Sequence, residues 1–477
     1  MNSAVVLSVL GTLLRFQGAI MLIPLLVAVY YNESTMPFIV GIVLTEICGI
    51  FLWLRYKSDD EWKHREAFAT VAFGWLTAAV FGTIPFIISG ISPINALFES
   101  MAGFTATGAT ILDDIGSHSK SILFWRSMIQ WIGGMGIIVL FIAILPKLSI
   151  AGRQLFRAEV PGLKEEKIKP RIRETAKILW MVYLLISSLQ TAMLYLAGMS
   201  IYDAIVHTFT TIGSAGFSPY GESIVAFNSP LIEAIITLFM FIAGVNFVLL
   251  YRTVYIDHTS IFRDEEFKFY TAIILTATAV LILTLRYGIA ADPFTCLRYA
   301  LFQVVSIITT TGFASVDFNL WPDSSRIVLV FMMFIGGCAG STSGGPTVAR
   351  VLLLLKYANS ELFRFIHPRA VKPIKFNGKV VPNDIIHQVI SFMVIYFLIF
   401  VTSTFLISLM NVDIITAFTA SIATLGNVGP GLNLVGPMSS YNCMPPLAKL
   451  IMIANMWIGR LEVFTVMVLF TPEFWKK

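Results

Sequence analysis

The chain has 477 residues, of which 57% are hydrophobic and 13% charged, with a net charge of +5 and a mean hydropathy of +0.80. A soluble domain carries about 25% charged residues, so this composition excludes a soluble globular protein, and it is too apolar for a disordered chain. Because a membrane-spanning helix needs roughly 20 apolar residues, the chain has room for about ten spans and little else. We therefore expect an all-α integral membrane protein without a separate catalytic domain.

Ten long apolar runs carry few charges. They lie near residues 4–30, 37–54, 67–89, 121–146, 178–199, 230–250, 269–289, 326–355, 386–410 and 446–471. The connections on one side hold 25 of the 33 Lys and Arg residues, and those on the other side hold six. The positive-inside rule then predicts a multi-pass protein of the cell membrane with both termini in the cytoplasm.

One pattern returns four times, after the third, fifth, seventh and ninth runs. Each copy has a polar or proline cap, a short amphipathic stretch and a small-residue turn that ends in glycine. The caps are Ser92, Ser200, Asp292 and residues 411–413. Such side chains accept hydrogen bonds from the free amides of a helix start. Each copy predicts a helix of about 12 residues, about 18 Å long, which enters a hydrocarbon core of about 30 Å from outside and must return.

The four returning stretches combine small residues with a final glycine. They are Ala106, Thr107 and Gly108; Ser214, Ala215 and Gly216; Thr310, Thr311 and Gly312; and Asn427, Val428 and Gly429. Extended backbone at this depth has unpaired carbonyls and must line a wet cavity or be buried in protein. Glycine adopts φ > 0 freely, which turns successive carbonyls the same way. A ring of carbonyl oxygens can replace the hydration shell of a monovalent cation, so the pattern predicts a cation pore.

The motifs that carry these turns resemble those of the potassium transporter superfamily formed by bacterial Trk and Ktr membrane subunits, fungal Trk and plant high-affinity potassium transporters. Nearly the whole chain is similar to the bacterial Trk-type subunits, of the TrkH/TrkG type. The similar segments are TATGAT, FTTIGSAGFS, VVSIITTTGFAS, GNVGPGL, IQWIGGMGIIVLFIAILP, RAEVPG, PRIRETAKILW, FIGGCAGSTSGG and IANMWIGRLEVFTVMVLFTPEFW.

The resemblance implies a pseudo-fourfold pore built from four tandem helix–pore-helix–helix repeats, with two extra N-terminal transmembrane helices. The corresponding ranges are residues 1–60 for the extra helices and 61–150, 151–260, 261–360 and 361–477 for the repeats. It also makes the four glycines those of a K+ filter, where the ion is bound by the four stretches only. Sodium-preferring relatives often have serine at the position of Gly108, so glycine there favours K+.

The resemblance further implies an intramembrane loop that obstructs the pore beneath the filter, within residues 336–346. The gate residues are Gly336, Gly337, Gly340, Ser341, Thr342, Gly344, Gly345 and Arg460. Five glycines and a proline in eleven residues cannot sustain a continuous helix. A kinked packing helix with small residues for close contact is the alternative.

Arg460 lies inside the last apolar run, where a charge costs about 2.5 to 3.5 kcal/mol. The resemblance implies that it lies on the pore, in contact with the loop of the third repeat, and the alternative is a salt bridge with Glu462 or another buried acid. Glu99, His207 and Gln303 lie on the short helices, and they either bind the ion or brace the filter through hydrogen bonds.

The resemblance also implies a homodimer and a cytosolic Trk-type regulatory ring that docks on the basic stretches from Lys147 to Lys177 and from Arg350 to Lys379. The chain has no phosphate-binding loop, so we expect it to bind no cofactor other than K+. Nucleotide, either NAD(H) or ATP/ADP, would act only through that partner. We expect no enzymatic activity and no nucleic-acid partner.

Two transport mechanisms fit this sequence. The first is a gated K+ pore, and the second is a coupled K+/H+ or K+/Na+ symporter with alternating access. Carriers usually have inverted repeats, whereas each repeat here begins inside and has its short helix outside, which favours the pore.

Overall fold

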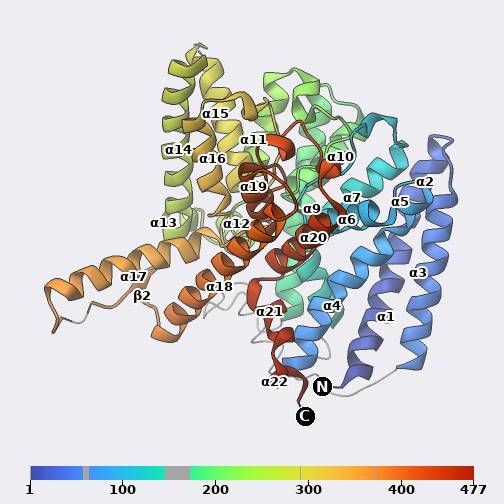
Figure 1. Ribbon diagram of the computed structural model, residues 1–477, viewed down its shortest axis with the longest axis horizontal. Helices are drawn as coiled ribbons and strands as arrows, with labels where there is room; N and C mark the ends of the chain where they lie inside the picture. The colour runs from blue at the N-terminus through green and yellow to red at the C-terminus, as the bar shows by residue number, and fades with distance from the viewer. Residues whose placement is uncertain (1, 57–63, 145–171, 290–291, 371, 477) are drawn as a thin grey trace.

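The computed structural model describes residues 2–56, 64–144, 172–289, 292–370 and 372–476. The protein is an all-α membrane protein, as predicted (Figure 1). Six helices of the described part are long and apolar enough to cross a membrane, or eight if each of two bent helix pairs is one span. The predicted docking stretch from Lys147 to Lys177 falls mostly outside the described residues.

The N-terminal helices form a separate layer at one side of the molecule (Figure 1). α1 (Ser3–Ile20) continues into α2 (Leu22–Tyr30) and packs against α3 (Met36–Arg55) and α4 (His64–Gly82). Gly11 of α1 faces Gly49 of α3 so closely that a Cβ on either glycine would meet the carbonyl oxygen of the other. Small residues at such a crossing let two helix backbones approach, which drives helix packing in lipid.

The rest of the chain repeats one order of a long helix, a short helix and a second helix. The elements are α4, α5 (Ile84–Ile88), α6 (Pro93–Phe104) and α7 (Lys120–Ile144); α9 (Ile172–Leu196), α10 (Ile201–Ile212), α11 (Pro230–Ala243), α12 (Phe247–Tyr255) and α13 (Ser260–Arg263); α14 (Glu265–Ile289), α15 (Pro293–Ile308), α16 (Asp323–Met333) and α17 (Val348–Ile366); and α18 (Asn383–Ser408), α19 (Ile414–Leu425), α20 (Pro446–Arg460), α21 (Val463–Met467) and α22 (Pro472–Trp475). Single 3-10 turns lie at Ile115–Ser117, Ser223–Phe227, Phe318–Leu320, Asn433–Val435, Tyr441–Cys443 and Val468–Phe470.

The short helices α6, α10, α15 and α19 begin where the capping residues predict. The side chains of Ser200, Asp292 and Asp413 each accept a hydrogen bond from an amide in the first helical turn. Hydrogen bonds from Thr295 hold the pKa of the Asp292 carboxyl below its ordinary value. Ser92 makes no such bond, and α6 instead begins with Pro93, whose missing N–H needs no acceptor. α15 has 16 residues, so it is longer than the expected 12.

Three of the second helices are interrupted. α11 and α12 meet at 99°, α20 and α21 meet at 115°, and residues 334–347 between α16 and α17 are not helical. The sequence predicts an interruption only in the third of these, and uninterrupted runs over 230–250 and 446–471. Asn246 explains the first bend because its side chain caps α12 through the amides of Val248 and Leu249. At the second bend Glu462 has a left-handed φ of 58°.

α17 projects away from the helical body, beside a small hairpin (Figure 1). The hairpin pairs β1 (Lys375–Phe376) with β2 (Lys379–Val380) in antiparallel register, with Lys375 opposite Val380. Both chain termini lie at the same end of the molecule (Figure 1).

Candidate functional site

The four returning stretches share one backbone conformation. The first residues, Ala106, Ser214, Thr310 and Asn427, have φ of 53°, 52°, 56° and 54°. The final glycines 108, 216, 312 and 429 have φ of 78°, 71°, 78° and 100°. The sequence predicts the positive φ of the glycines but not that of the first residues, because non-glycine residues rarely adopt this region. The same rarely populated conformation in all four copies indicates that the four stretches have a common function. We call these stretches the four central tripeptides.

The amides of each central tripeptide turn back onto the short helix that precedes it. In the first copy, the amides of Thr107 and Gly108 both donate to the carbonyl oxygen of Ala102, at 2.8 and 3.4 Å. The other copies make the same pair of bonds, to Thr210, Ser306 and Ala423. These bonds satisfy a carbonyl at the helix end. Since the amides are used in this way, the tripeptides offer their carbonyl oxygens for other contacts.

The four central tripeptides close into a ring. A Cβ added to Gly108 would collide with the carbonyl oxygen of Ala215 in the second tripeptide. The same relation continues from Gly216 to Thr311, from Gly312 to Val428 and from Gly429 back to Thr107. All four oxygen-bearing residues are fully buried. Only glycine leaves room at these positions for the carbonyl oxygen of the next repeat. The four oxygens surround one axis.

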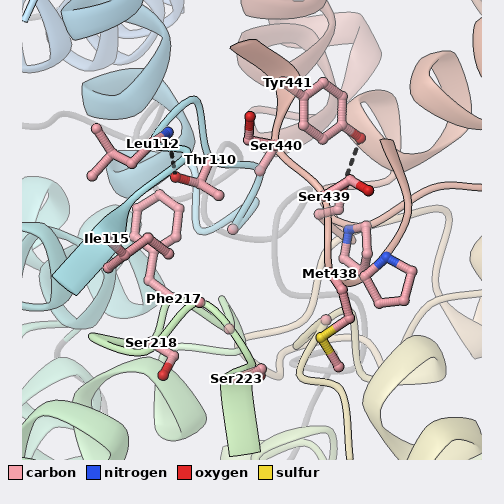
Figure 2. Close-up of a pocket in the computed structure, with 18 of the residues that line it drawn as sticks. Thr110, Leu112, Ile115, Phe217, Ser218, Ser223, Met438, Ser439, Ser440 and Tyr441 are labelled. Carbon is pink, nitrogen blue, oxygen red and sulfur yellow. Dashed lines mark hydrogen bonds between the residues drawn. The ribbon is translucent and has the colours of Figure 1, made fainter. Parts of the chain in front are cut away.

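A cavity of about 280 Å³ lies against this ring. All four glycines line it, together with residues that follow the tripeptides. Figure 2 shows its wall, which Thr110 and Phe217 form on one side and Tyr441 forms on the other. The Tyr441 hydroxyl donates to the carbonyl oxygen of Gly429 at 2.7 Å. The cavity therefore borders the ring on the side of the final glycines.

A buried ion pair braces the first two tripeptides. Glu99 of α6 pairs with Arg126 of α7, and both side chains are at most 1% exposed. The Glu99 carboxylate also accepts the Ile111 amide at 2.9 Å, and Arg126 donates to the carbonyl oxygen of Ser218 at 2.7 Å. His207 also lies within hydrogen-bonding distance of the Ser218 hydroxyl, at 3.2 Å. Glu99 and His207 thus contact residues just beyond the tripeptides, and each also has a partner on a helix, Arg126 for Glu99 and the Asp203 carbonyl oxygen for His207.

Several bracing residues are absent from the sequence-based prediction. Gln130 of α7 donates to the carbonyl oxygen of Ala215 at 3.0 Å and accepts the Phe217 amide at 3.1 Å. Asn427, which the sequence places in the fourth tripeptide, also has an unpredicted bracing contact, because its side chain donates to the Thr107 hydroxyl of the first tripeptide at 2.9 Å. Gln130 and Arg126 are polar residues inside an apolar run. This position could have identified them as bracing residues, because buried polar groups in a membrane need partners.

The loop formed by residues 334–347 lies against the ring and contains every predicted gate residue except Arg460. The Gly344 amide donates to the Thr310 hydroxyl at 2.7 Å. The hydroxyls of Thr342 and Ser214 are 2.8 Å apart. A Cβ on Gly344 would also collide with the side chain of Asn427. The loop therefore contacts three of the four central tripeptides.

The bend between α11 and α12 holds the same loop. Gly244 accepts the Cys338 amide at 2.9 Å, and the Phe247 amide donates to Gly340 at 3.1 Å. The Asn246 side chain donates to the carbonyl oxygen of Ala339 at 2.7 Å. The bend thus supplies backbone partners to a segment that would otherwise have unpaired polar groups in the membrane.

Arg460 ends α20 and reaches the loop. Its guanidinium donates to the carbonyl oxygen of Thr342 at 3.0 Å and to those of Gly133 and Gly134 in α7 at 2.8 and 3.1 Å. Glu462 instead pairs with Arg350, which follows the loop. Of the two expectations for Arg460, contact with the loop is therefore observed, and the salt bridge with Glu462 is wrong.

Comparison with known proteins agrees with this architecture. Residues 34–477 match the family model of the TrkH cation transport proteins. The chain is 42% identical to the Trk system potassium uptake protein TrkH of Salmonella typhimurium, with both chains covered completely. It is 33% identical to TrkG of Escherichia coli K12, over 99% of this chain and 98% of the relative. The crystal structure of the potassium transporter TrkH from Vibrio parahaemolyticus superposes with a TM-score of 0.91, at 37% identity and complete coverage of both chains. The chain therefore belongs to the TrkH family of cation transport proteins.

Proposed function

We propose that this protein is the K+-permeating membrane subunit of a Trk-type uptake system and that the four central tripeptides are its selectivity filter. The observation that carries the proposal is the closed ring of carbonyl oxygens of Thr107, Ala215, Thr311 and Val428. Carbonyl dipoles replace the water of a dehydrated monovalent cation. The short helices add the negative ends of their dipoles, which favours a cation over an anion. The named substrate of the relatives, potassium, supports K+ as the ion.

In this proposal the loop of residues 334–347 is the gate. It packs against three tripeptides and would have to move for an ion to leave the ring on that side. Arg460 holds the loop through Thr342 and places a fixed positive charge beside the path. The charge lowers cation occupancy there while the loop is closed.

We further propose that the chain works as a homodimer in the cell membrane with both termini in the cytoplasm. A cytosolic Trk-type regulatory subunit would bind the basic side, and NAD(H) or ATP/ADP would act through that subunit only. The unequal distribution of Lys and Arg over the two sides supports the orientation. The membrane potential then supplies about 2.3 kcal/mol per charge per 100 mV for K+ entry.

Reconstitution of the purified protein in planar bilayers tests the proposal. Discrete unitary currents with a reversal potential near that of K+ are expected, with and without the cytosolic partner to measure its control. Slow flux without unitary currents, driven by an imposed H+ or Na+ gradient, would instead support a coupled symporter. The absence of any K+ flux from protein that remains folded and dimeric would refute both mechanisms.

A further inference from the structure

Glu266 is a buried acid that the filter and the gate, as described so far, leave without a role. It lies in the first turn of α14 and is 6% exposed. Its Oε1 atom accepts the amide of Ala339 at 2.6 Å and the amide of Ala349 at 3.1 Å. A buried acid at this position needs such partners because its desolvation is costly.

The two amides flank residues 340–348, which comprise the second half of the gate loop and the first residue of α17. Ala339 lies where the loop passes the bend between α11 and α12, and Ala349 lies in the first turn of α17. The Ala349 amide is one of the helix-start donors that have no acceptor within their own helix, and a carboxylate is favourable there. One oxygen atom of Glu266 thus joins both ends of residues 340–348.

The hydrogen bonds between the loop and the ring each involve one hydroxyl of a central tripeptide. Thr342 meets a hydroxyl of the second tripeptide, and Gly344 donates to a hydroxyl of the third. Glu266 instead accepts two hydrogen bonds at one oxygen atom. Gly340 and Gly345 both have φ of 76°, so the segment between the two ends is flanked by residues that change conformation easily. Arg460 also holds this segment through the carbonyl oxygen of Thr342, so the segment is released when this bond and the ring contacts break while the two bonds to Glu266 remain.

The backbone that carries Glu266 is itself fixed. The Asp264 carboxylate accepts the Phe267 amide at 2.8 Å. Asn377, in the turn of the β1–β2 hairpin, donates to the Asp264 carboxylate at 2.8 Å and accepts the Glu265 amide at 2.8 Å. The start of α14 is held from two directions, so Glu266 stays in place when the loop moves.

We propose that Glu266 is the positioning residue of the gate. It fixes residues 339 and 349, so that the segment between them swings as a flap and returns to the closed position under the ring. The inference rests on the proposed permeation function. It adds to that function a residue outside the filter and outside the loop, whose loss should favour the open gate.

The test measures K+ efflux from proteoliposomes that contain the full chain without any partner. Glu266→Gln keeps a carbonyl acceptor at the same place, so its efflux should stay within about twofold of that of the unmodified chain. Glu266→Ala, which removes the acceptor, should raise efflux by tenfold or more. Glu265→Gln is the matched control because Glu265 pairs with Lys356 rather than with the loop.

Damage to the protein would lower K+ efflux, whereas release of the gate would raise it. The direction of the change therefore distinguishes damage from gate opening. The K+/Na+ permeability ratio should stay at the value of the unmodified chain in every variant. Efflux from Glu266→Ala equal to or below that of the unmodified chain would overturn the inference, and Glu266→Leu, which fills the space without an acceptor, decides the test if Glu266→Ala does not fold. An increase shared by Glu265→Gln would also overturn it. If the unmodified chain itself carries no K+ flux, the proposed function fails instead.

Discussion

Gly108 is the position where one added side chain should change ion selectivity most directly. Its φ is 78°, and a Cβ there would collide with the carbonyl oxygen of Ala215 in the ring. Replacing Gly108 by serine therefore imposes two costs. The left-handed backbone costs a residue other than glycine roughly 1–2 kcal/mol, and the collision must displace one of the four oxygens that surround the ion.

The displacement of this oxygen determines how much the K+/Na+ permeability ratio changes. A ring tuned to K+ loses discrimination as its oxygens move, and each 1.4 kcal/mol lost from the difference between K+ and Na+ binding is about tenfold in their ratio. The strain at Gly108 is of this size, so Gly108→Ser should lower the K+/Na+ permeability ratio about tenfold. Reversal potentials in planar bilayers with K+ on one side and Na+ on the other measure this ratio.

Gly198 provides the matched control. Its φ is 102°, but no atom lies within 4 Å of the position of an added Cβ. Gly198→Ser therefore introduces the backbone strain without touching the ring, and its permeability ratio should equal that of the unmodified chain. An unchanged ratio in Gly108→Ser, or the same decrease in both variants, would refute the argument that the glycine is required by the neighbouring oxygen.

Three further predictions concern the bracing contacts. Arg460→Ala should increase K+ efflux from proteoliposomes without a partner, because the loop loses its bond at Thr342; reduced efflux from folded protein would contradict this. Arg126→Met leaves Glu99 buried without its cation, which costs about 3–5 kcal/mol, so the melting temperature in detergent should fall, and adding Glu99→Gln should restore part of it. Tyr441→Phe removes one neutral hydrogen bond, of about 1 kcal/mol, and should lower the K+/Na+ ratio only severalfold, measured as for Gly108.

The topology and the short helices could be predicted because their signals are local. Caps such as Asp292 and Asp413 mark a helix start wherever they occur. The final glycine of each tripeptide likewise predicts a left-handed turn from the local sequence alone. The φ of 56° at Thr310 could not be predicted, because threonine disfavours it and only the ring around it enforces it.

The bends in the second and fourth repeats depend on contacts between distant segments. Gly244 leaves its helix at a point where its carbonyl oxygen can accept the Cys338 amide, 94 residues later in the chain. Arg460 ends α20 where it can reach Thr342 and α7. The apolar pattern of residues 230–250 and 446–471 is that of a simple span, so the run itself contains no sign of the interruption. Asn246, a capping residue inside such a run, is the exception.

Ion density in the ring is the most direct test of the account. A structure determined from protein in Rb+ or Tl+, recorded at a wavelength where the ion scatters anomalously, locates the ion without assumptions about flux. We predict a peak on the axis bounded by the carbonyl oxygens of Thr107, Ala215, Thr311 and Val428. A ring without any peak in protein that conducts these ions, or a peak held elsewhere by side-chain carboxylates, would contradict the central claim.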